Sequence, residues 1–212
     1  MNLLTVGDSF TYGTELDNPS EHAWPVLLSR RLLANLTNIS SGGFSNDAMF
    51  RECVEQVSKA HYDLVIVAWT DPARLEIARN GQPFSVNLSP RMEKLVPWLR
   101  DYYTYNQDDE HSYRRTIAMM LSLQSFLKSR NIRYIFVSTF GLQTLTAKYQ
   151  EKYKFLTDLI DRDHYPGWPD SGIVEWMGDC PKGPGGHPLE LGHQRIFGRI
   201  YDEYTGNIGR LP

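Results

Sequence analysis

Leu3-Leu4-Thr5-Val6-Gly7-Asp8-Ser9 decides the fold, because a short apolar run stops at a glycine and two polar residues follow at once. Such a run is typical of a strand that is buried on both faces of a parallel sheet. Two more runs of this kind cover residues 64–69 and 132–140, and a weaker one covers 36–39. Ser9 is therefore expected at the carboxyl end of a strand, where open α/β sheets bind their ligands.

Helical patterns separate these runs. Apolar residues recur at helical spacing over residues 24–33, 48–57 and 113–129, and again after residue 188. Strands that alternate with helices favour βαβ units, in which helices cover both faces of a parallel sheet. We therefore predict a three-layer α/β/α domain with a mainly parallel sheet of about five strands, the usual size of such sheets.

The alternation is interrupted at about 72–112. Asn80-Gly81 stands between two short apolar stretches, which predicts a β-hairpin, and an aromatic-rich stretch around Trp98 and Tyr102 follows. We expect residues 1–212 to form a single domain in which this insertion lies over the functional site.

Composition excludes several classes of protein. The 212 residues are 41% apolar, which suits one folded domain, and a formal net charge of −3 provides no cationic surface for nucleic acid. Cys53 and Cys180 lie far apart without a CxxC pairing, which predicts free thiols rather than a zinc site or a disulfide.

No stretch of the sequence approaches the roughly 18 apolar residues that a membrane span requires. The first residues also lack the basic and apolar regions of a secretory signal. We therefore expect a protein that is cytoplasmic as synthesised and has no membrane partner, and this expectation leaves association with a virion open.

A second polar motif, Gly186-His187-Pro188, opens the last helical pattern. Pro188 suits the first position of a helix, which places His187 at about the N-cap. Each motif has an ordinary structural interpretation, because Asp8, Ser9 and His187 are all residue types that cap helices and turns. A serine at a strand end with a histidine elsewhere in the fold also matches a nucleophile and its general base.

Together the two motifs resemble the SGNH (GDSL) hydrolase family, which pairs a Gly-Asp-Ser after the first strand with a His-Pro before the last helix. Residues 38–43 look like the second block of the family, and Ala68-Trp69-Thr70-Asp71 occupies its third. The resemblance implies a flavodoxin-like strand order, Ser9 as nucleophile and His187 as general base. It also implies an oxyanion hole made by the amides of Ser9 and Gly43 and by the side chain at position 70.

The sequence departs from the family at two places. Position 70 is Thr instead of Asn, so the expected side-chain donor is a hydroxyl, which has one proton to give. The acid that normally precedes the histidine by three residues is replaced by Pro184. We predict Asp179 as the acid that orients His187, although a backbone carbonyl could orient the ring instead. Glu190 has an ordinary explanation, because an acid in the first turn of a helix interacts favourably with the helix dipole.

Residues beside these motifs are candidates for substrate binding. The stretch Phe44-Ser45-Asn46-Asp47 is similar to one in SGNH-like proteins of phages and environmental bacteria. Capping of the next helix explains these residues as well, and surface solvation explains the arginines at 51 and 74. The predicted substrate-binding residues are Asn46, Trp69, Asp71 and Arg74.

The resemblance implies a serine ester hydrolase that acts on a small acyl ester and needs no cofactor or metal. Aromatic residues in the insertion and the C-terminal loops suit sugar rings, so an O-acetyl group on a carbohydrate is the first expectation for the substrate. The alternative is a non-catalytic binding or virion-associated module that keeps the SGNH scaffold after losing the third-block Asn and the acid.

Overall fold

The computed structural model describes residues 1–87 and 89–207. Its central sheet is parallel and has the strand order β2-β1-β3-β6. The strands are β1 (Asn2–Val6), β2 (Asn35–Asn38), β3 (Leu64–Trp69) and β6 (Arg133–Ser138). These are the four runs found in the sequence. The sheet has four strands in the described residues, one fewer than the approximate five expected from typical sheet size, and short helices and loops follow β6.

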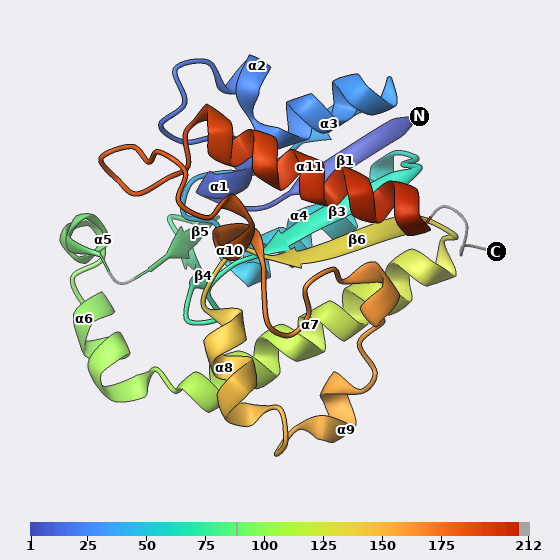
Figure 1. Cartoon of the computed structure of the whole chain (residues 1–212). Coiled ribbons are helices and arrows are strands. Elements are labelled where there is room, and N and C mark those ends of the chain that lie inside the picture. The colour runs from blue at the N-terminus through green and yellow to red at the C-terminus, as the bar shows by residue number, and fades with distance from the viewer. Residues whose placement is uncertain (88, 208–212) are drawn as a thin grey trace.

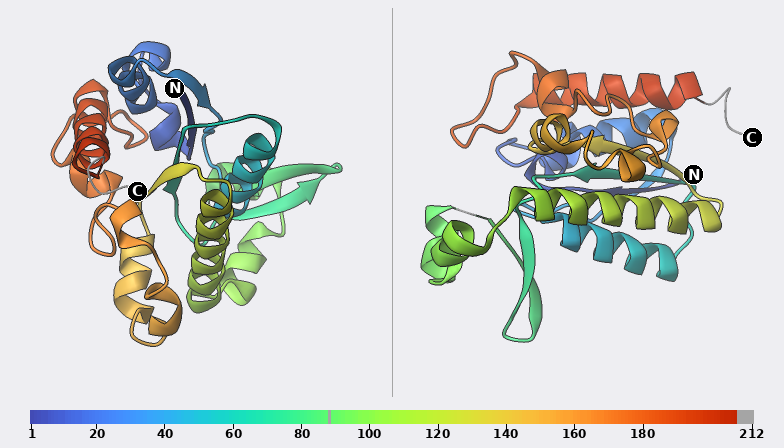
Figure 2. Two further views of the ribbon diagram at one scale, coloured as in Figure 1. Left: turned by 90° about the vertical axis from the view of Figure 1, so that its right-hand side faces the viewer. Right: turned by 90° about the horizontal axis from the view of Figure 1, so that it is seen from below.

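Helices cover both faces of this sheet (Figures 1 and 2). One face packs against α4 (Asn46–Lys59), α7 (Asp109–Ser129) and α8 (Leu142–Tyr149). The other packs against α3 (Trp24–Leu32), α10 (Ile173–Met177) and α11 (Glu190–Asn207). Val65 and Val67 point to the first layer, whereas Leu64 and Ile66 point to the second, so every position of β3 must be apolar. The predicted three-layer α/β/α architecture is confirmed.

The predicted hairpin is present in segment 72–112. Asn80 and Gly81 have φ values of 51° and 73°, as a two-residue turn with both central residues in the left-handed region requires. Val86, Val96 and Leu99 form a small core of their own in this segment. Its elements are β4 (Leu75–Arg79), β5 (Gln82–Val86), α5 (Pro90–Leu95), α6 (Leu99–Asp101) and the π-helix η1 (Tyr102–Asn106).

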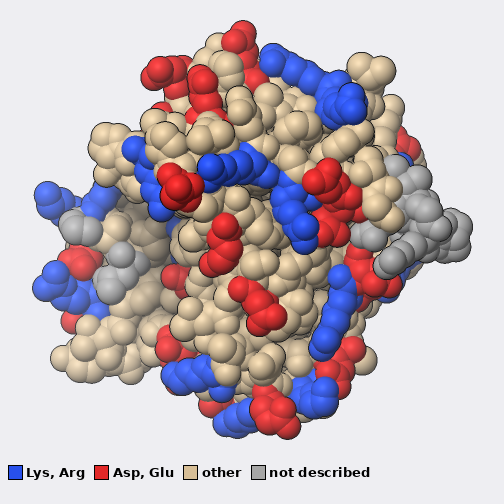
Figure 3. All heavy atoms as spheres, viewed as in Figure 1, with Lys and Arg blue, Asp and Glu red and all other residues tan. Residues whose placement is uncertain are grey.

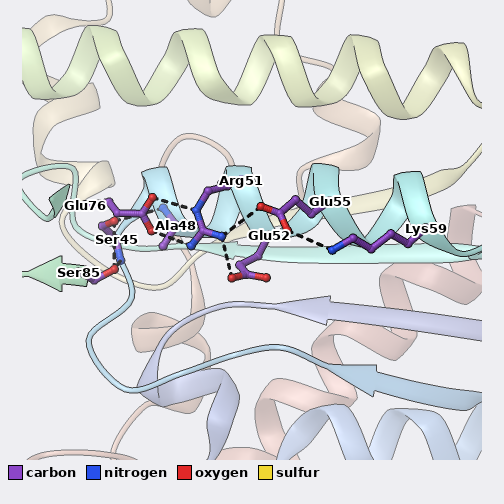
Figure 4. A network of polar contacts seen from close by, with 8 residues as sticks. All are labelled: Ser45, Ala48, Arg51, Glu52, Glu55, Lys59, Glu76 and Ser85. Carbon is purple, nitrogen blue, oxygen red and sulfur yellow. Dashed lines mark hydrogen bonds and ion pairs between the residues drawn. The ribbon is translucent and has the colours of Figure 1, made fainter. Parts of the chain in front are cut away.

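Arg51 joins the hairpin to helix α4 (Figure 4). Its Nε and Nη2 donate to the two carboxylate oxygens of Glu76 on β4, at 3.0 and 2.8 Å. The amide of Glu76 in turn donates to Asp47 at 3.3 Å, in the first turn of α4. A bidentate arginine–carboxylate pair restrains the relative orientation of its two residues and also pairs their charges. Arg51 is therefore a structural link between the hairpin and the sheet's helical layer.

The remaining helices are short: α2 (Pro19–His22), α9 (Lys154–Thr157) and the 3-10 helix η2 (Arg162–His164).

Cys53 and Cys180 are both free, as predicted, and both are buried. Within the described residues, no helix is long and apolar enough to cross a membrane. On the face in Figure 3, cationic and anionic side chains are interspersed. Of the predicted domain over 1–212, residues 88 and 208–212 lie outside the described residues.

His193 on α11 is fully buried and neutral in the fold. The amide of Trp24 donates to its Nδ1 at 3.2 Å, so the ring proton is on Nε2, which has no partner among the described residues. Burial lowers the pKa of His193 from 6.5 to about 4. Between pH 6.5 and pH 4, this histidine is protonated in the unfolded chain but not in the folded chain. The free energy of unfolding must therefore fall as the pH falls through this range.

We expect the free energy of unfolding to drop by roughly 3 kcal/mol from pH 7 to pH 4 through His193 alone. Urea unfolding at a series of pH values measures this. His193→Asn keeps an acceptor for Trp24 and should flatten the profile in this window. His111→Asn, at an exposed histidine on α7, is the matched control and should leave the profile unchanged. An unaltered slope in His193→Asn would show that other groups set the acid sensitivity.

Candidate active site

Gly7, Asp8 and Ser9 form a tight strand-to-helix turn at the carboxyl end of β1. A Cβ at Gly7 would lie 2.2 Å from Thr11 Oγ1, so only glycine allows helix α1 (Ser9–Tyr12) to pack this closely. Asp8 caps α1 by accepting from the amide of Phe10 at 3.0 Å. Ser9 is the first helical residue, and its own amide therefore lies among those that have no partner within the helix.

The strand order places this turn at the switch point of the sheet. The chain leaves β1 toward β2 on one side, whereas β3 pairs with β1 on the other. The carboxyl ends of β1 and β3 consequently border the crevice in which doubly wound sheets bind ligands. Ser9 is 7% exposed there, and its hydroxyl makes no hydrogen bond to another described residue.

His187 lies on a short loop that a β-bridge closes at its base. Lys182 pairs with Pro188 in this bridge, and the amide of Gly183 donates to the carbonyl of His187 at 2.9 Å. Helix α11 begins at Glu190, so the predicted helical start at Pro188 is wrong, because the bridge holds that residue in extended conformation. The imidazole is 5.2 Å from the ring of Phe10, the residue after Ser9.

The carboxylate that contacts His187 is Glu15. Its Oε2 is 2.9 Å from His187 Nδ1 and accepts from the His187 amide at 3.1 Å, while Oε1 accepts from the amide of Gly185 at 2.6 Å. The hydrogen bond from Gly185 is the main cause that lowers the pKa of Glu15. An ionised Glu15 accepts the proton of Nδ1, which leaves Nε2 of His187 free to act as a base.

The histidine loop is built around Glu15. A Cβ on Gly183 would lie 2.6 Å from the carboxyl carbon of Glu15, and one on Gly185 would lie 3.1 Å from its oxygens. Glu15 itself has a φ of 72°, a conformation that non-glycine residues rarely adopt. The glycine-rich stretch and the left-handed backbone together allow the carboxylate to reach two amides and the ring.

The prediction that Asp179 orients His187 must be corrected. Asp179 is 95% exposed and pairs with Arg195 at 2.9 Å. Glu190, the alternative acid, lies 3.6 Å from His22 and is also more than half exposed. Sequence reasoning missed Glu15, because the absence of an acid at position 184 indicated that another carboxylate was needed but did not show which one.

Thr70 does not face the position of an oxyanion, contrary to expectation. Its hydroxyl donates to Oδ2 of Asp8 at 2.7 Å, and both residues are fully buried. Arg74 also contacts Asp8 Oδ2, at 3.3 Å, and donates to the carbonyl of Phe44 at 3.1 Å. Burial raises the pKa of Asp8, and the charge of Arg74 opposes that rise. The one proton of Thr70 therefore stabilises the turn that holds Ser9.

Two predicted substrate-binding residues are interior instead. Trp69 is fully buried and makes an edge-on contact with Phe136, because helices cover both faces of β3 and all its side chains point into a core. Asn46 exchanges two hydrogen bonds with the backbone of Thr70, at 2.8 and 3.0 Å, and so joins α4 to the end of β3. Neither side chain is available to a ligand.

The other two predicted substrate residues, Asp71 and Arg74, line a cavity of about 400 Å³. Its remaining lining includes Asn87, Ser89, Tyr103 and Phe140. The guanidinium of Arg74 lies 4.9 Å from the ring of Phe140, which is 5.6 Å from the ring of Phe10. Phe140 in the wall of this cavity thus contacts Phe10, whose ring also contacts His187.

Gly43 lies in a loop that packs on the Ser9 turn. The amide of Ser41 donates to the carbonyl of Gly7 at 3.2 Å, and Gly43 has a φ of 83° that suits glycine. Nδ2 of Asn87 is 4.0 Å from where a Cβ on Gly43 would be. Among the described residues, no group of three or more His, Cys, Asp and Glu side chains could hold a metal ion.

A family model described as a family of unknown function (DUF6071) matches residues 14–205, so the chain belongs to this family. A search of curated proteins finds no match.

Solved structures share the fold. TesA is 13% identical, with a TM-score of 0.59 over 97% of this chain and 99% of that one. The psychrotrophic esterase EstA from Pseudoalteromonas sp. is 13% identical, with a TM-score of 0.59 over 98% of each chain. A family two carbohydrate esterase from Clostridium thermocellum, solved with cellohexaose, is 16% identical, with a TM-score of 0.58 over 99% of this chain and 65% of that one. At these identities the likeness shows the fold alone, and this fold is the one that the SGNH resemblance implied.

Proposed function

We propose that this member of DUF6071 is a serine ester hydrolase in which Ser9 is the nucleophile, His187 the general base and Glu15 the orienting acid. The observation that carries the proposal is the contact of Glu15 with His187 Nδ1 at 2.9 Å, on a loop beside the Ser9 turn. A nucleophile, a base and a carboxylate that orients the base are recognised as a triad by geometry and not by their order in the sequence.

In the first step, Ser9 Oγ bonds to the ester carbonyl carbon while its proton passes to His187 Nε2 and the carbonyl electron pair moves to oxygen. Collapse of this intermediate expels the alkoxide, which takes the proton from His187. Water then attacks the acyl-enzyme with His187 again as base, and the acid leaves with Ser9 restored. Glu15 stabilises the imidazolium in both halves.

The hydroxyl of Ser9 makes no hydrogen bond to His187 in this structure, although both residues are described. Catalytic hydrogen bonds are often long without a substrate and tighten in the Michaelis complex. The amides of Ser9 and Gly43 are the proposed backbone donors to the oxyanion, and the amide end of helix α1 adds a positive field there.

The proposed substrate class is an O-acetyl ester on a carbohydrate. Trp98 is 49% exposed and Tyr105 is 80% exposed on the segment that follows the hairpin, and such rings suit the apolar faces of sugars. Tyr103 plays a different part, because its hydroxyl donates to the carbonyl of Ala73 at 2.9 Å and its ring packs on the hairpin core. The likeness to carbohydrate esterases also supports this class.

Acetate release tests the proposal. The chain should hydrolyse p-nitrophenyl acetate and an acetylated oligosaccharide, faster for acetyl than for long acyl groups. If the folded chain hydrolyses no acetyl, butyryl or longer ester, the proposal is wrong.

Trp98→Ala should raise KM for an acetylated oligosaccharide roughly threefold to tenfold, which corresponds to about 1 kcal/mol of lost aromatic contact. The same change should leave kcat and KM for p-nitrophenyl acetate near the wild-type values, because that small ester does not reach the ring. Phe155→Ala, at an exposed ring on α9, is the matched control and should affect neither substrate. Equal losses on both substrates would count against a sugar-binding role.

A further inference from the structure

Asn87, directly after β5, carries an amide side chain with no hydrogen-bond partner among residues 1–87 and 89–207. Its Oδ1 is buried and unpaired among the described residues, and its Nδ2 makes no hydrogen bond to them either. Nδ2 nevertheless lies beside Gly43, 4.0 Å from where a Cβ would be. Buried polar groups are nearly always paired, so the unpaired Oδ1 marks this side chain as unusual. The donor group is Nδ2, which lies beside Gly43 on a residue that lines the cavity.

The hairpin holds Asn87 at this place. The amide of Ser45 donates to Ser85 Oγ at 3.1 Å, and the two hydroxyls are 3.3 Å apart. Ser85 on β5 precedes Asn87 by two residues. Ser45 follows Gly43 by the same interval. The serine contact, seen in Figure 4 beside the Arg51–Glu76 pair, therefore sets Asn87 against Gly43.

The side-chain donor that the sequence led us to expect, Thr70, is already engaged. The hydroxyl of Thr70 is used by Asp8 at 2.7 Å, and the Nη1 of Arg74 is used by Asp8 and by the carbonyl of Phe44. Asn87 lines the same cavity as Arg74, so its amide is open to a bound molecule. A carboxamide N–H is a suitable donor to an oxyanion, as are backbone amides.

We infer that Asn87 Nδ2 donates a hydrogen bond to the oxyanion that forms when Ser9 attacks, alongside the amides of Ser9 and Gly43. This inference rests on the proposed function. In this inference Asn87, which follows the hairpin, takes the donor role that the sequence assigned to Thr70. The hairpin segment then takes part in catalysis, in addition to any role in substrate binding.

Kinetics on p-nitrophenyl acetate test the inference. Asn87→Ala should lower kcat by roughly a hundredfold to a thousandfold with little change in KM, as the loss of one oxyanion donor does. Asn87→Asp keeps the volume and should lose at least as much, because a carboxylate repels the oxyanion. Asn80→Gly, at the hairpin turn, removes an amide from the same segment and preserves the turn, so it should retain wild-type rates.

A second readout separates catalysis from structure. Methylboronic acid forms a tetrahedral adduct with a catalytic serine, so its inhibition constant should rise in Asn87→Ala by about the same factor as kcat/KM falls. A change that only loosened the hairpin would raise KM and lower the melting temperature in both Asn87 variants.

The outcomes are distinct. If the wild-type chain hydrolyses the ester through Ser9 and both Asn87 variants keep kcat within about threefold, this inference fails and the proposed function stands. If the wild-type chain hydrolyses no ester, the proposed function fails and the inference falls with it. Loss of kcat in both variants, matched by weaker boronate inhibition and an unchanged Asn80→Gly, supports the inference.

Discussion

Ser9→Ala is expected to lower kcat for an activated acetyl ester by on the order of 10⁵-fold to 10⁶-fold, with KM little changed. The change removes the atom that forms the acyl-enzyme and leaves only the oxyanion donors and binding. Steady-state kinetics measure the loss, and circular dichroism checks the fold. Ser20→Ala, at an exposed serine on α2, should retain full activity.

Activity of Ser9→Ala within tenfold of the wild type would contradict this expectation and assign the hydrolysis to another group. No hydrolysis by the folded wild-type chain would instead favour the alternative drawn from the sequence, a binding module on an SGNH scaffold. That alternative rested on the missing acid and the missing third-block Asn. In our proposal Glu15 takes the place of the missing acid, and Asn87 takes the place of the missing Asn.

Glu15→Gln is expected to lower kcat by roughly 10³-fold to 10⁴-fold, as the loss of a triad acid does. The glutamine side chain is neutral and cannot stabilise the imidazolium. Its NH2 group would also face a backbone N–H of Gly185 or His187, so that two donors would meet. Because the pKa of Glu15 lies below its usual value, the wild-type carboxylate stays ionised throughout the neutral range.

Asp179→Asn and Glu190→Gln are the matched controls, since each replaces an acid near the histidine loop by its amide. Both should retain wild-type kcat, because Asp179 pairs with Arg195 and Glu190 faces His22. A large loss in Asp179→Asn together with normal rates in Glu15→Gln would reverse the assignment of the acid.

The fold could be predicted because each strand carries a local signal. Every position of the run at 64–69 is apolar, since helices cover both faces of the sheet. Asn80-Gly81 indicates a hairpin turn, because both of its residues must adopt left-handed backbone. The fifth strand was an assumption from typical sheet size, with no apolar run behind it.

The site was harder to predict, because its key contacts join distant parts of the chain. Glu15 and His187 are 172 residues apart, and no periodicity links them. Asn87 and Gly43 are 44 residues apart, and the contact between Ser85 and Ser45 joins their two segments. Nearness in sequence misled in two cases. Asp179 is close to His187 along the chain but pairs with Arg195, and Trp69 belongs to the third block but points into the core.

Covalent labelling with an alkyl fluorophosphonate tests the central claim, that Ser9 is a nucleophile activated by His187 and Glu15, most directly. Intact mass should show one adduct per chain, and peptide mapping should place it on Ser9. Labelling should be absent in Ser9→Ala and strongly slowed in His187→Ala and Glu15→Gln. No adduct on the folded wild-type chain, or an adduct that persists in Ser9→Ala, would contradict the account.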